Sequence, residues 1–228
     1  MRQRSTEVET TADRPAPGLV VHQPKRGFRY GAEAFWLVGY ALSLGPLPTS
    51  AIDLGTGSGV MALLLGRLGV PAHGVDVRAE WRPLWRDTLA ASSVSASVRL
   101  TLRDVGEGPL GPVDLVVSNP PFFTAASGPR AADPWRAAAR TESTATLHDF
   151  VAVAVGSLGP SGRACLVVPR ERAHELEAHP SCRQVVHVGR RRTLLAFGAV
   201  AAAAAREVAD RGPEVRAWYD LAGAGSGV

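Results

Sequence analysis

The chain has 228 residues, of which 46% are hydrophobic and 20% charged, so it carries enough apolar side chains for one globular domain with a proper core. Its formal net charge of +4 permits a polyanionic partner without demanding one. The two cysteines, Cys165 and Cys182, lack the spacing of a metal site or a disulfide framework. No apolar run approaches the ~20 residues of a membrane helix, and the N-terminus lacks the apolar centre of a secretion signal. We therefore expect a cytoplasmic protein with neither a metal nor a membrane partner.

Composition divides the chain into a central domain and two tails. Residues 1–17 are polar, charged and proline-bearing, which is typical of a disordered N-terminal tail. Residues 18–198 alternate between strand and helix patterns, and we expect them to form one folded domain. Residues 199–228 are an Ala- and Gly-rich C-terminal extension, in which the alanine run predicts either a terminal helix or disorder.

Strand and helix patterns alternate through the central domain. Apolar runs of strand length occur, in chain order, at residues 18–24, 50–54, 72–77, 98–102, 113–118 and 162–169, and an antiparallel pair closes the domain at 183–188 and 193–200. Helical periodicity occurs between them at residues 32–44, 60–69, 78–91 and 147–158. This alternation, with continuous apolar strands, predicts an α/β fold in which an open, mostly parallel sheet carries helices on both faces.

A glycine loop follows the first central strand. Asp53 lies near the strand end, and Gly55, Gly57 and Gly59 follow with GxGxG spacing where a helix begins. Such glycines let the backbone approach a ligand where any Cβ would clash. Dinucleotide sites instead use GxGxxG to seat a pyrophosphate on the helix N-terminus. An acid at position 53 would repel phosphate, so the loop suits a cationic ligand.

Two further acids follow the next two strands. Asp76 closes the second central strand, where a carboxylate can accept both ribose hydroxyls, and Asp104 follows the third, placed to accept from an exocyclic amine. A cationic head, a ribose and an adenine without phosphates describe S-adenosylmethionine. The alternative is that Asp53 and Asp104 cap helices or turns and that the glycines are ordinary turn residues.

An Asn-Pro-Pro corner follows the fourth strand. Asn119 and Pro120 can offer a side-chain oxygen and a backbone carbonyl, held by the stiff Pro-Pro backbone. Two acceptors aimed at the two N–H bonds of an amine favour the tetrahedral nitrogen that methyl transfer needs. Phe122 can stack on a planar base turned out of its helix. The alternative is a tight turn with Phe122 and Phe123 in the core.

Three segments together resemble the bacterial tRNA(Val) adenine-N6 methyltransferase family. They are DLGTGSG at 53–59, NPPFF at 119–123 and QPKRGFRYGAEAFWL at 23–37, and the similarity runs from about Val20 to Phe197. The resemblance implies a Rossmann-like, seven-stranded sheet with the last strand antiparallel, S-adenosylmethionine as cofactor, and methylation of an adenine beside the anticodon of a tRNA. It implies cofactor contacts at Asp53, Gly55, Gly57, Asp76 and Asp104, with Asn119, Pro120 and Phe122 at the target amine.

Three departures from that family bear on the substrate. Phe122 stands where the family commonly has a tyrosine, and NPPF also occurs in guanine-N2 methyltransferases of ribosomal RNA. Glu33 stands where the family usually has an aspartate, and the helix over 78–91 lacks the asparagines common at its end. The alternatives are therefore guanine N2 in ribosomal RNA, a protein glutamine amide, or a non-catalytic scaffold of the same fold that binds RNA.

Basic residues flank the predicted pocket in sequence order. They lie before the first helix, in the segment after the Asn-Pro-Pro corner and in the turn between the last two strands: Lys25, Arg26, Arg29, Arg140 and Arg191. They could neutralise phosphates around a flipped base, although a solvated surface explains the arginines of the middle segment equally well. We expect a monomer that binds RNA.

Overall fold

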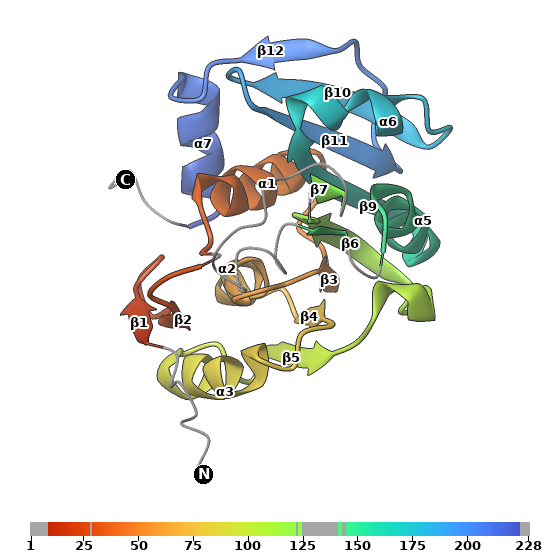
Figure 1. Ribbon diagram of the computed structural model, residues 1–228. Helices are drawn as coiled ribbons and strands as arrows, with labels where there is room; N and C mark the ends of the chain where they lie inside the picture. Colours follow the sequence, from red (N-terminus) through yellow and green to blue (C-terminus); the bar gives the residue numbers. More distant parts are fainter. Residues whose placement is uncertain (1–8, 28, 122, 125–140, 143–144, 224–228) are drawn as a thin grey trace.

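An eight-stranded sheet forms the centre of the computed structural model, which describes residues 9–27, 29–121, 123–124, 141–142 and 145–223 (Figure 1). The strand order is β12-β10-β11-β9-β6-β3-β4-β5. The strands are β3 (Ala51–Leu54), β4 (Ala72–Asp76), β5 (Val98–Leu102), β6 (Val113–Ser118), β9 (Leu158–Pro169), β10 (Cys182–Val188), β11 (Arg192–Gly198) and β12 (Arg206–Val208). Only β11 among them runs antiparallel, pairing with β9 and β10. The predicted mostly parallel sheet with an antiparallel closing strand is confirmed.

Helices cover both faces of this sheet, as predicted. They are α1 (Ala32–Ser43), α2 (Val60–Arg67), α3 (Trp81–Ala91), α5 (Leu147–Gly156), α6 (His174–Glu177) and α7 (Pro213–Leu221), with short 3-10 turns η1 (Val105–Glu107) and η2 (Arg170–Arg172). The side chains of α1, α2 and α7 share one buried cluster with one sheet face, and those of α5 and α6 share a second cluster with the other. The connection from β5 to β6 contains only η1.

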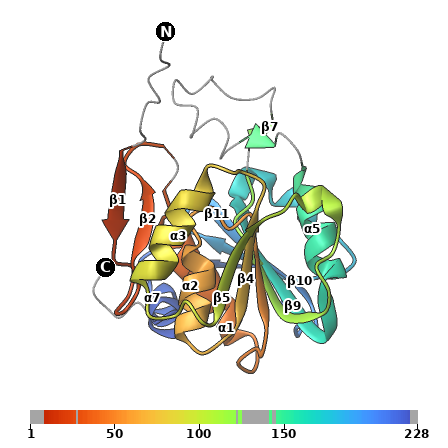
Figure 2. The ribbon, with the colours of Figure 1, turned by 90° about the horizontal axis from the view of Figure 1, so that it is seen from below.

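The N-terminal segment adds a hairpin outside the main sheet. β1 (Thr10–Asp13) pairs antiparallel with β2 (Val21–Pro24), and the hairpin lies beside α3 (Figure 2). The backbone N–H of His22 donates to Thr88 Oγ1 at 2.8 Å, which ties β2 to α3. The prediction of a disordered tail over 1–17 is therefore wrong from residue 9 onward, because strand pairing satisfies a polar backbone and the Ala16 side chain is buried. Residues 1–8 lie outside the described residues.

The C-terminal extension is also part of the fold as far as residue 223. β12 pairs parallel with β10 and gives the sheet one strand more than the seven predicted. α7 packs on α1 so closely that a Cβ at Gly39 would lie 2.0 Å from the carbonyl oxygen of Trp218. The extension predicted from residue 199 onward therefore contributes to the core, because Val215 and Trp218 form an apolar stripe that α1 buries.

Two further short strands, β7 (Phe123–Thr124) and β8 (Thr141–Glu142), pair parallel just beyond the end of β6. Among the described residues, no helix has the length and apolar character needed to cross a membrane.

Candidate active site

The predicted cofactor contacts and Asn119 lie at or just beyond the carboxyl ends of neighbouring strands, along one edge of the sheet. Leu54 in β3 pairs with Val75 in β4 on one side and with Ser118 in β6 on the other, and Asp76 pairs with Leu102 in β5. The segments that follow these strands therefore leave the sheet side by side, at the end where β7 lies in Figure 2. Ligands of open α/β sheets bind at this carboxyl edge.

The glycine loop adopts a conformation that other residues would strain. Gly55, Gly57 and Gly59 have φ angles of +69°, +52° and +85°, a region that side chains with a Cβ disfavour. A Cβ at Gly59 would lie 2.8 Å from Cδ1 of Leu100. The loop therefore needs glycine for its own backbone and for its packing against β5.

Hydrogen bonds hold the Gly57 residue from two sides. Its N–H donates to Asp76 Oδ2 at 3.0 Å, and its carbonyl accepts from the indole Nε1 of Trp85 at 2.7 Å. The sequence predicts a helix over 78–91 and does not single out Trp85 within it. This hydrogen bond depends on how α3 packs against the loop in the folded protein. Helical periodicity in the sequence does not predict such a contact.

Asp53 is fully buried beneath the loop. Its Oδ2 accepts from Thr56 Oγ1 at 2.6 Å and from the N–H of Ala62 at 3.3 Å, so it caps the start of α2 as the structural alternative expected. Its Oδ1 is buried with no hydrogen-bond partner among the described residues. Burial raises the pKa of Asp53 to about 7, against the lowering effect of these two hydrogen bonds.

Asp76 and Asp104 occupy the two neighbouring strand ends. Asp76 Oδ1 accepts from the N–H of Arg78 at 3.0 Å, and the adjacent Val77 is 44% exposed, one of the few large apolar side chains left open to solvent among the described residues. Asp104 caps η1, accepting from the N–H of Gly106 at 2.8 Å. The capping role that the alternative gave Asp104 is therefore present, and a cofactor contact there stays a proposal.

Asn119 extends from the end of β6, one residue beyond the pair that Ser118 makes with Leu54. The Ser118 hydroxyl donates to the Leu54 carbonyl at 2.8 Å and fixes this strand end. Asn119 Oδ1 is buried and has no hydrogen-bond partner among the described residues. Pro120 is buried next to it. Phe122 and the Phe123 side chain lie outside what the structure describes.

The basic residues predicted to contact RNA differ in whether they form ion pairs with acidic residues of the protein. Lys25 pairs with Glu9 at 3.5 Å and Arg29 with Asp13 at 2.5 Å. Arg26 is exposed and makes no ion pair with any described residue. Arg191 is exposed in the turn between β10 and β11, and Arg140 lies outside the described residues.

Glu33, the residue that departs from the expected aspartate, forms an ion pair across the fold. Its Oε1 accepts from Nε of Arg192 at 2.9 Å. Arg192 follows Arg191 in the basic turn, so the longer side chain of Glu33 links the first turn of α1 to the start of β11.

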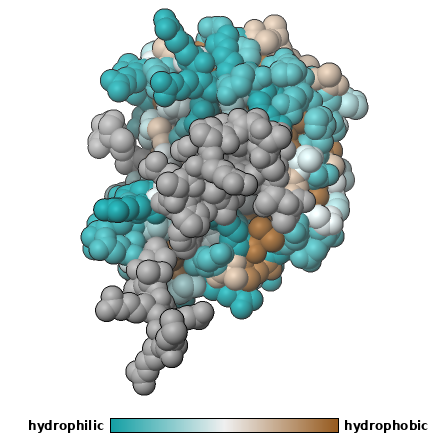
Figure 3. Space-filling model, in the orientation of Figure 1, coloured by the Kyte–Doolittle hydropathy of each residue, from teal (hydrophilic) through white to brown (hydrophobic). Residues whose placement is uncertain are grey.

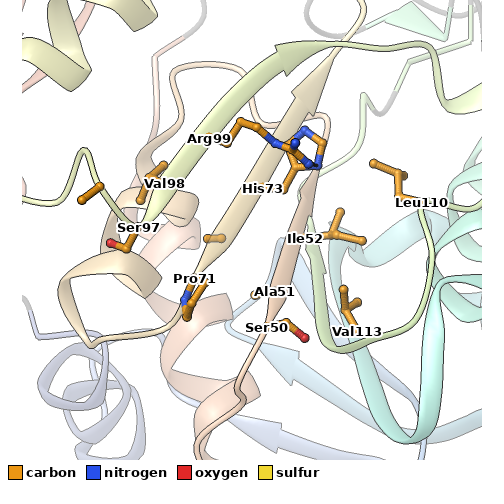
Figure 4. Close-up of a pocket in the computed structure, with 12 residues that line it drawn as sticks. Ser50, Ala51, Ile52, Pro71, His73, Ser97, Val98, Arg99, Leu110 and Val113 are labelled. Atoms are coloured by element: carbon orange, nitrogen blue, oxygen red, sulfur yellow. Dashed lines mark hydrogen bonds between the residues drawn. The ribbon is translucent and has the colours of Figure 1, made fainter.

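A pocket of about 340 Å³ opens at the opposite, amino edge of the sheet (Figure 4). In it the His73 ring lies between Arg99, which contacts Nδ1 at 3.0 Å, and Thr101, which contacts Nε2 at 2.7 Å. Burial, together with the charges of Arg99 and Arg103, lowers the pKa of His73 to about 4. None of the residues predicted for the site lines this pocket.

The described residues also contain no group of three His, Cys, Asp or Glu side chains that could hold a metal ion.

The fold is that of a methyltransferase. A Thermus thermophilus 16S rRNA N2 methyltransferase, solved with AdoMet and guanosine, superposes with a TM-score of 0.59 at 23% identity over 83% of this chain and 50% of that chain. The catalytic domain of hMettl16, solved with an RNA hairpin, gives a TM-score of 0.59 at 17% identity over 82% of this chain and 78% of that chain. At these identities the likeness establishes the fold alone.

Residues 41–187 match the methyltransferase small domain family, and the chain belongs to that family. A tRNA1(Val) (adenine(37)-N6)-methyltransferase from Porphyromonas gingivalis is 32% identical over 150 residues, which is 62% of this chain and 58% of that protein. The enzyme of the same name from Aeromonas salmonicida is 33% identical over 130 residues, 55% of this chain and 53% of that protein. The predicted resemblance is confirmed, and the chain matches less than two thirds of the length of these relatives.

Proposed function

We propose that this protein transfers a methyl group from S-adenosylmethionine to the N6 amine of an adenine in tRNA, beside the anticodon. The observation that carries the proposal is the buried oxygen of Asn119, which has no partner among the described residues. A buried acceptor without a donor costs about 1–3 kcal/mol. An N–H group of a substrate amine bound at the end of β6 would remove that cost.

The residues of the carboxyl edge fit the proposed cofactor. Asp53 Oδ1 is a second buried acceptor without a partner among the described residues, and it suits the cationic amino-acid end. Gly55 and Gly57 allow close approach to that end, Asp76 would accept from the ribose hydroxyls, and Asp104 from the adenine amine. When bound, S-adenosylmethionine supplies an electrophilic methyl group on a sulfonium.

The protein's own part in the reaction is to hold the amine. Asn119 Oδ1 and the Pro120 carbonyl oxygen accept hydrogen bonds from the two N–H groups of the amine. These bonds turn the nitrogen lone pair out of conjugation and stabilise the positive charge that develops on the nitrogen. The two prolines keep these acceptors rigid. No strong base is needed, because the methylated ammonium loses its proton readily to water. Phe122 would stack on the base.

The choice of tRNA rests on the relatives and on charge. Both relatives named above act on adenine 37 of a tRNA, and the net charge of +4 suits a polyanion. The face seen in Figure 3 is mostly hydrophilic outside the grey atoms, with smaller apolar areas at its lower and right-hand sides. We expect a monomer that works where tRNA is processed, in the cytoplasm.

The test is methyl transfer by the wild-type protein and by Asn119→Ala. Each would be incubated with labelled cofactor and unmodified transcripts of each tRNA and of ribosomal RNA, and the digested nucleosides identified by mass spectrometry. We expect N6-methyladenosine in one tRNA, with the rate in Asn119→Ala lower by about 100-fold or more and cofactor affinity unchanged. Ser118→Ala controls for disturbance of the strand end.

Other results would either change the proposed substrate or refute the proposed function. N2-methylguanosine in ribosomal RNA would keep the role of Asn119 and replace the substrate. A protein that binds the cofactor but labels no RNA would refute the RNA substrate, and the acceptor would then be sought among protein glutamines. A protein that does not bind the cofactor would be a scaffold of the same fold.

A further inference from the structure

We propose that Trp85 is a positioning residue, whose indole N–H sets the orientation of the Gly57 carbonyl so that the glycine loop is preformed for the cofactor; this rests on the proposed function. Trp85 lies in α3, 28 residues from the loop, and is only 3% exposed. Its Nε1 lies 2.7 Å from the Gly57 oxygen in a buried hydrogen bond.

The need for such a bond follows from the flexibility of glycine. Gly57 has a φ of +52°, and without a Cβ its neighbouring peptides can rotate through regions closed to other residues. The bond from the Gly57 N–H to Asp76 Oδ2 restrains the peptide before this residue. The hydrogen bond from Trp85 restrains the peptide after Gly57. The two hydrogen bonds together therefore restrict the rotation of both peptides that flank Gly57.

Packing alone does not require tryptophan at this place. Trp81, Leu84 and Trp85 form a buried cluster against Leu100 and Leu102 of β5, which phenylalanine could also join. Phenylalanine has no hydrogen-bond donor, whereas an indole combines a large apolar ring with an N–H donor on the side of that ring. The Trp85 side chain therefore does two things: its ring packs in the buried cluster, and its N–H donates a hydrogen bond to the loop.

The helix that carries Trp85 is itself anchored away from the loop. Thr88 Oγ1 accepts from the N–H of His22 at 2.8 Å, and Ser92 Oγ accepts from the N–H of Val20 at 3.0 Å. The N-terminal hairpin thus holds α3 along its length. A rigid support lets one hydrogen bond fix the loop instead of moving with it.

The sharpest variant is Trp85→Phe, which keeps an aromatic ring and removes the N–H. Ser97→Ala is the control, because it removes one partly buried hydrogen bond, which Ser97 Oγ donates to the Val94 carbonyl at 3.1 Å, and involves neither the loop nor the bonds that anchor α3. Affinity for S-adenosylmethionine and S-adenosylhomocysteine would be measured by calorimetry, kcat and KM by methyl transfer, and amide exchange over residues 55–59 by mass spectrometry without cofactor.

We expect Trp85→Phe to raise the dissociation constants and the KM for the cofactor by about three- to tenfold, with kcat changed by less than twofold and exchange over 55–59 accelerated. Ser97→Ala should leave all of these unchanged. Equal affinities and equal exchange in Trp85→Phe and wild type would overturn the positioning role. A wild-type protein that binds neither compound would instead refute the proposed function, and the exchange data would still decide whether Trp85 orders the loop.

Discussion

Two side-chain oxygens at the carboxyl edge are buried without a partner among the described residues, one on Asp53 and one on Asn119. A buried polar group without a hydrogen bond costs free energy, and a bound ligand, ion or water that completes it is one explanation for its presence in a native fold. Both belong to motifs that the sequence singles out for ligand contact. The proposed contacts to cofactor and substrate thus fall on the oxygen atoms that lack a hydrogen-bond partner.

Asp53 predicts a distinct dependence of stability on pH. Burial raises its pKa from 3.8 to about 7, so the folded state holds a proton that the unfolded chain releases. Its contribution to the free energy of unfolding therefore falls as the pH rises from about 4 to about 7, and is constant above that range. Relative to Asp53→Asn, the wild type should lose stability over this window.

Urea unfolding of both proteins between pH 4.5 and pH 8 would measure the difference, because this range covers most of the window set by the two pKa values. The comparison with the variant is needed because His73 acts in the opposite direction. Its pKa is lowered from 6.5 to about 4, so its contribution is complete above pH 6.5 and is lost as the pH falls. A difference between the two proteins that is flat across the window would contradict the raised pKa of Asp53.

At the scale of elements, the contact between α1 and α7 is the least expected part of the fold. Gly39 lies in the middle of α1, directly against the backbone of Trp218. Figure 1 shows the two helices side by side, with the rings of Tyr40 and Trp218 5.5 Å apart. This closeness is available only to glycine.

Gly39→Ala should therefore destabilise the protein by at least ~2 kcal/mol, since overpacking against backbone cannot relax cheaply. In an ordinary helix interior the same change stabilises by about 1 kcal/mol, so the sign alone is informative. Gly159→Ala is the control, because its Cβ would meet its nearest atom at 3.7 Å, and it should change stability by less than about 0.5 kcal/mol. A stabilised Gly39→Ala protein would contradict the packing.

The sequence predicts those elements whose apolar residues have a regular period. The strands at 51–54 and 113–118 and the helices α1 and α5 follow from this pattern, and the order of the motifs predicts one shared edge. β12 follows an alanine run without any period, and its pairing depends on the distant strand β10. The sequence of α7 does contain helix features, namely Pro213 at its start and apolar residues at 215 and 218. The Ala- and Gly-rich composition of the extension drew attention away from them.

At the scale of the whole molecule, the charge of +4 matters through its distribution. Lys25 and Arg29 are paired with acids of the N-terminal segment, and Arg192 is paired with Glu33. Ion pairs of this kind leave less charge to meet a phosphate. Among the predicted contacts that the structure describes, Arg26 and Arg191 retain the most accessible charge.

Arg26→Ala should weaken tRNA binding about three- to tenfold at low salt and reduce the dependence of log affinity on log salt by about one. Fluorescence anisotropy with labelled tRNA over a series of salt concentrations would measure both. Arg216→Ala, which removes an exposed arginine from α7, is the charge-matched control. If the two variants behave alike, position 26 has no particular role and only the net charge matters.

The packing of α7 on α1 ties the order of synthesis to the completion of the fold. α1 leaves the ribosome well before its partner helix, which begins at residue 213, so Tyr40 remains without Trp218 until residue 218 has emerged. Contacts this distant in sequence form late, because a long loop must close first. A nascent chain halted before α7 should present the apolar face of α1 to a chaperone, and release of the finished chain should end that binding.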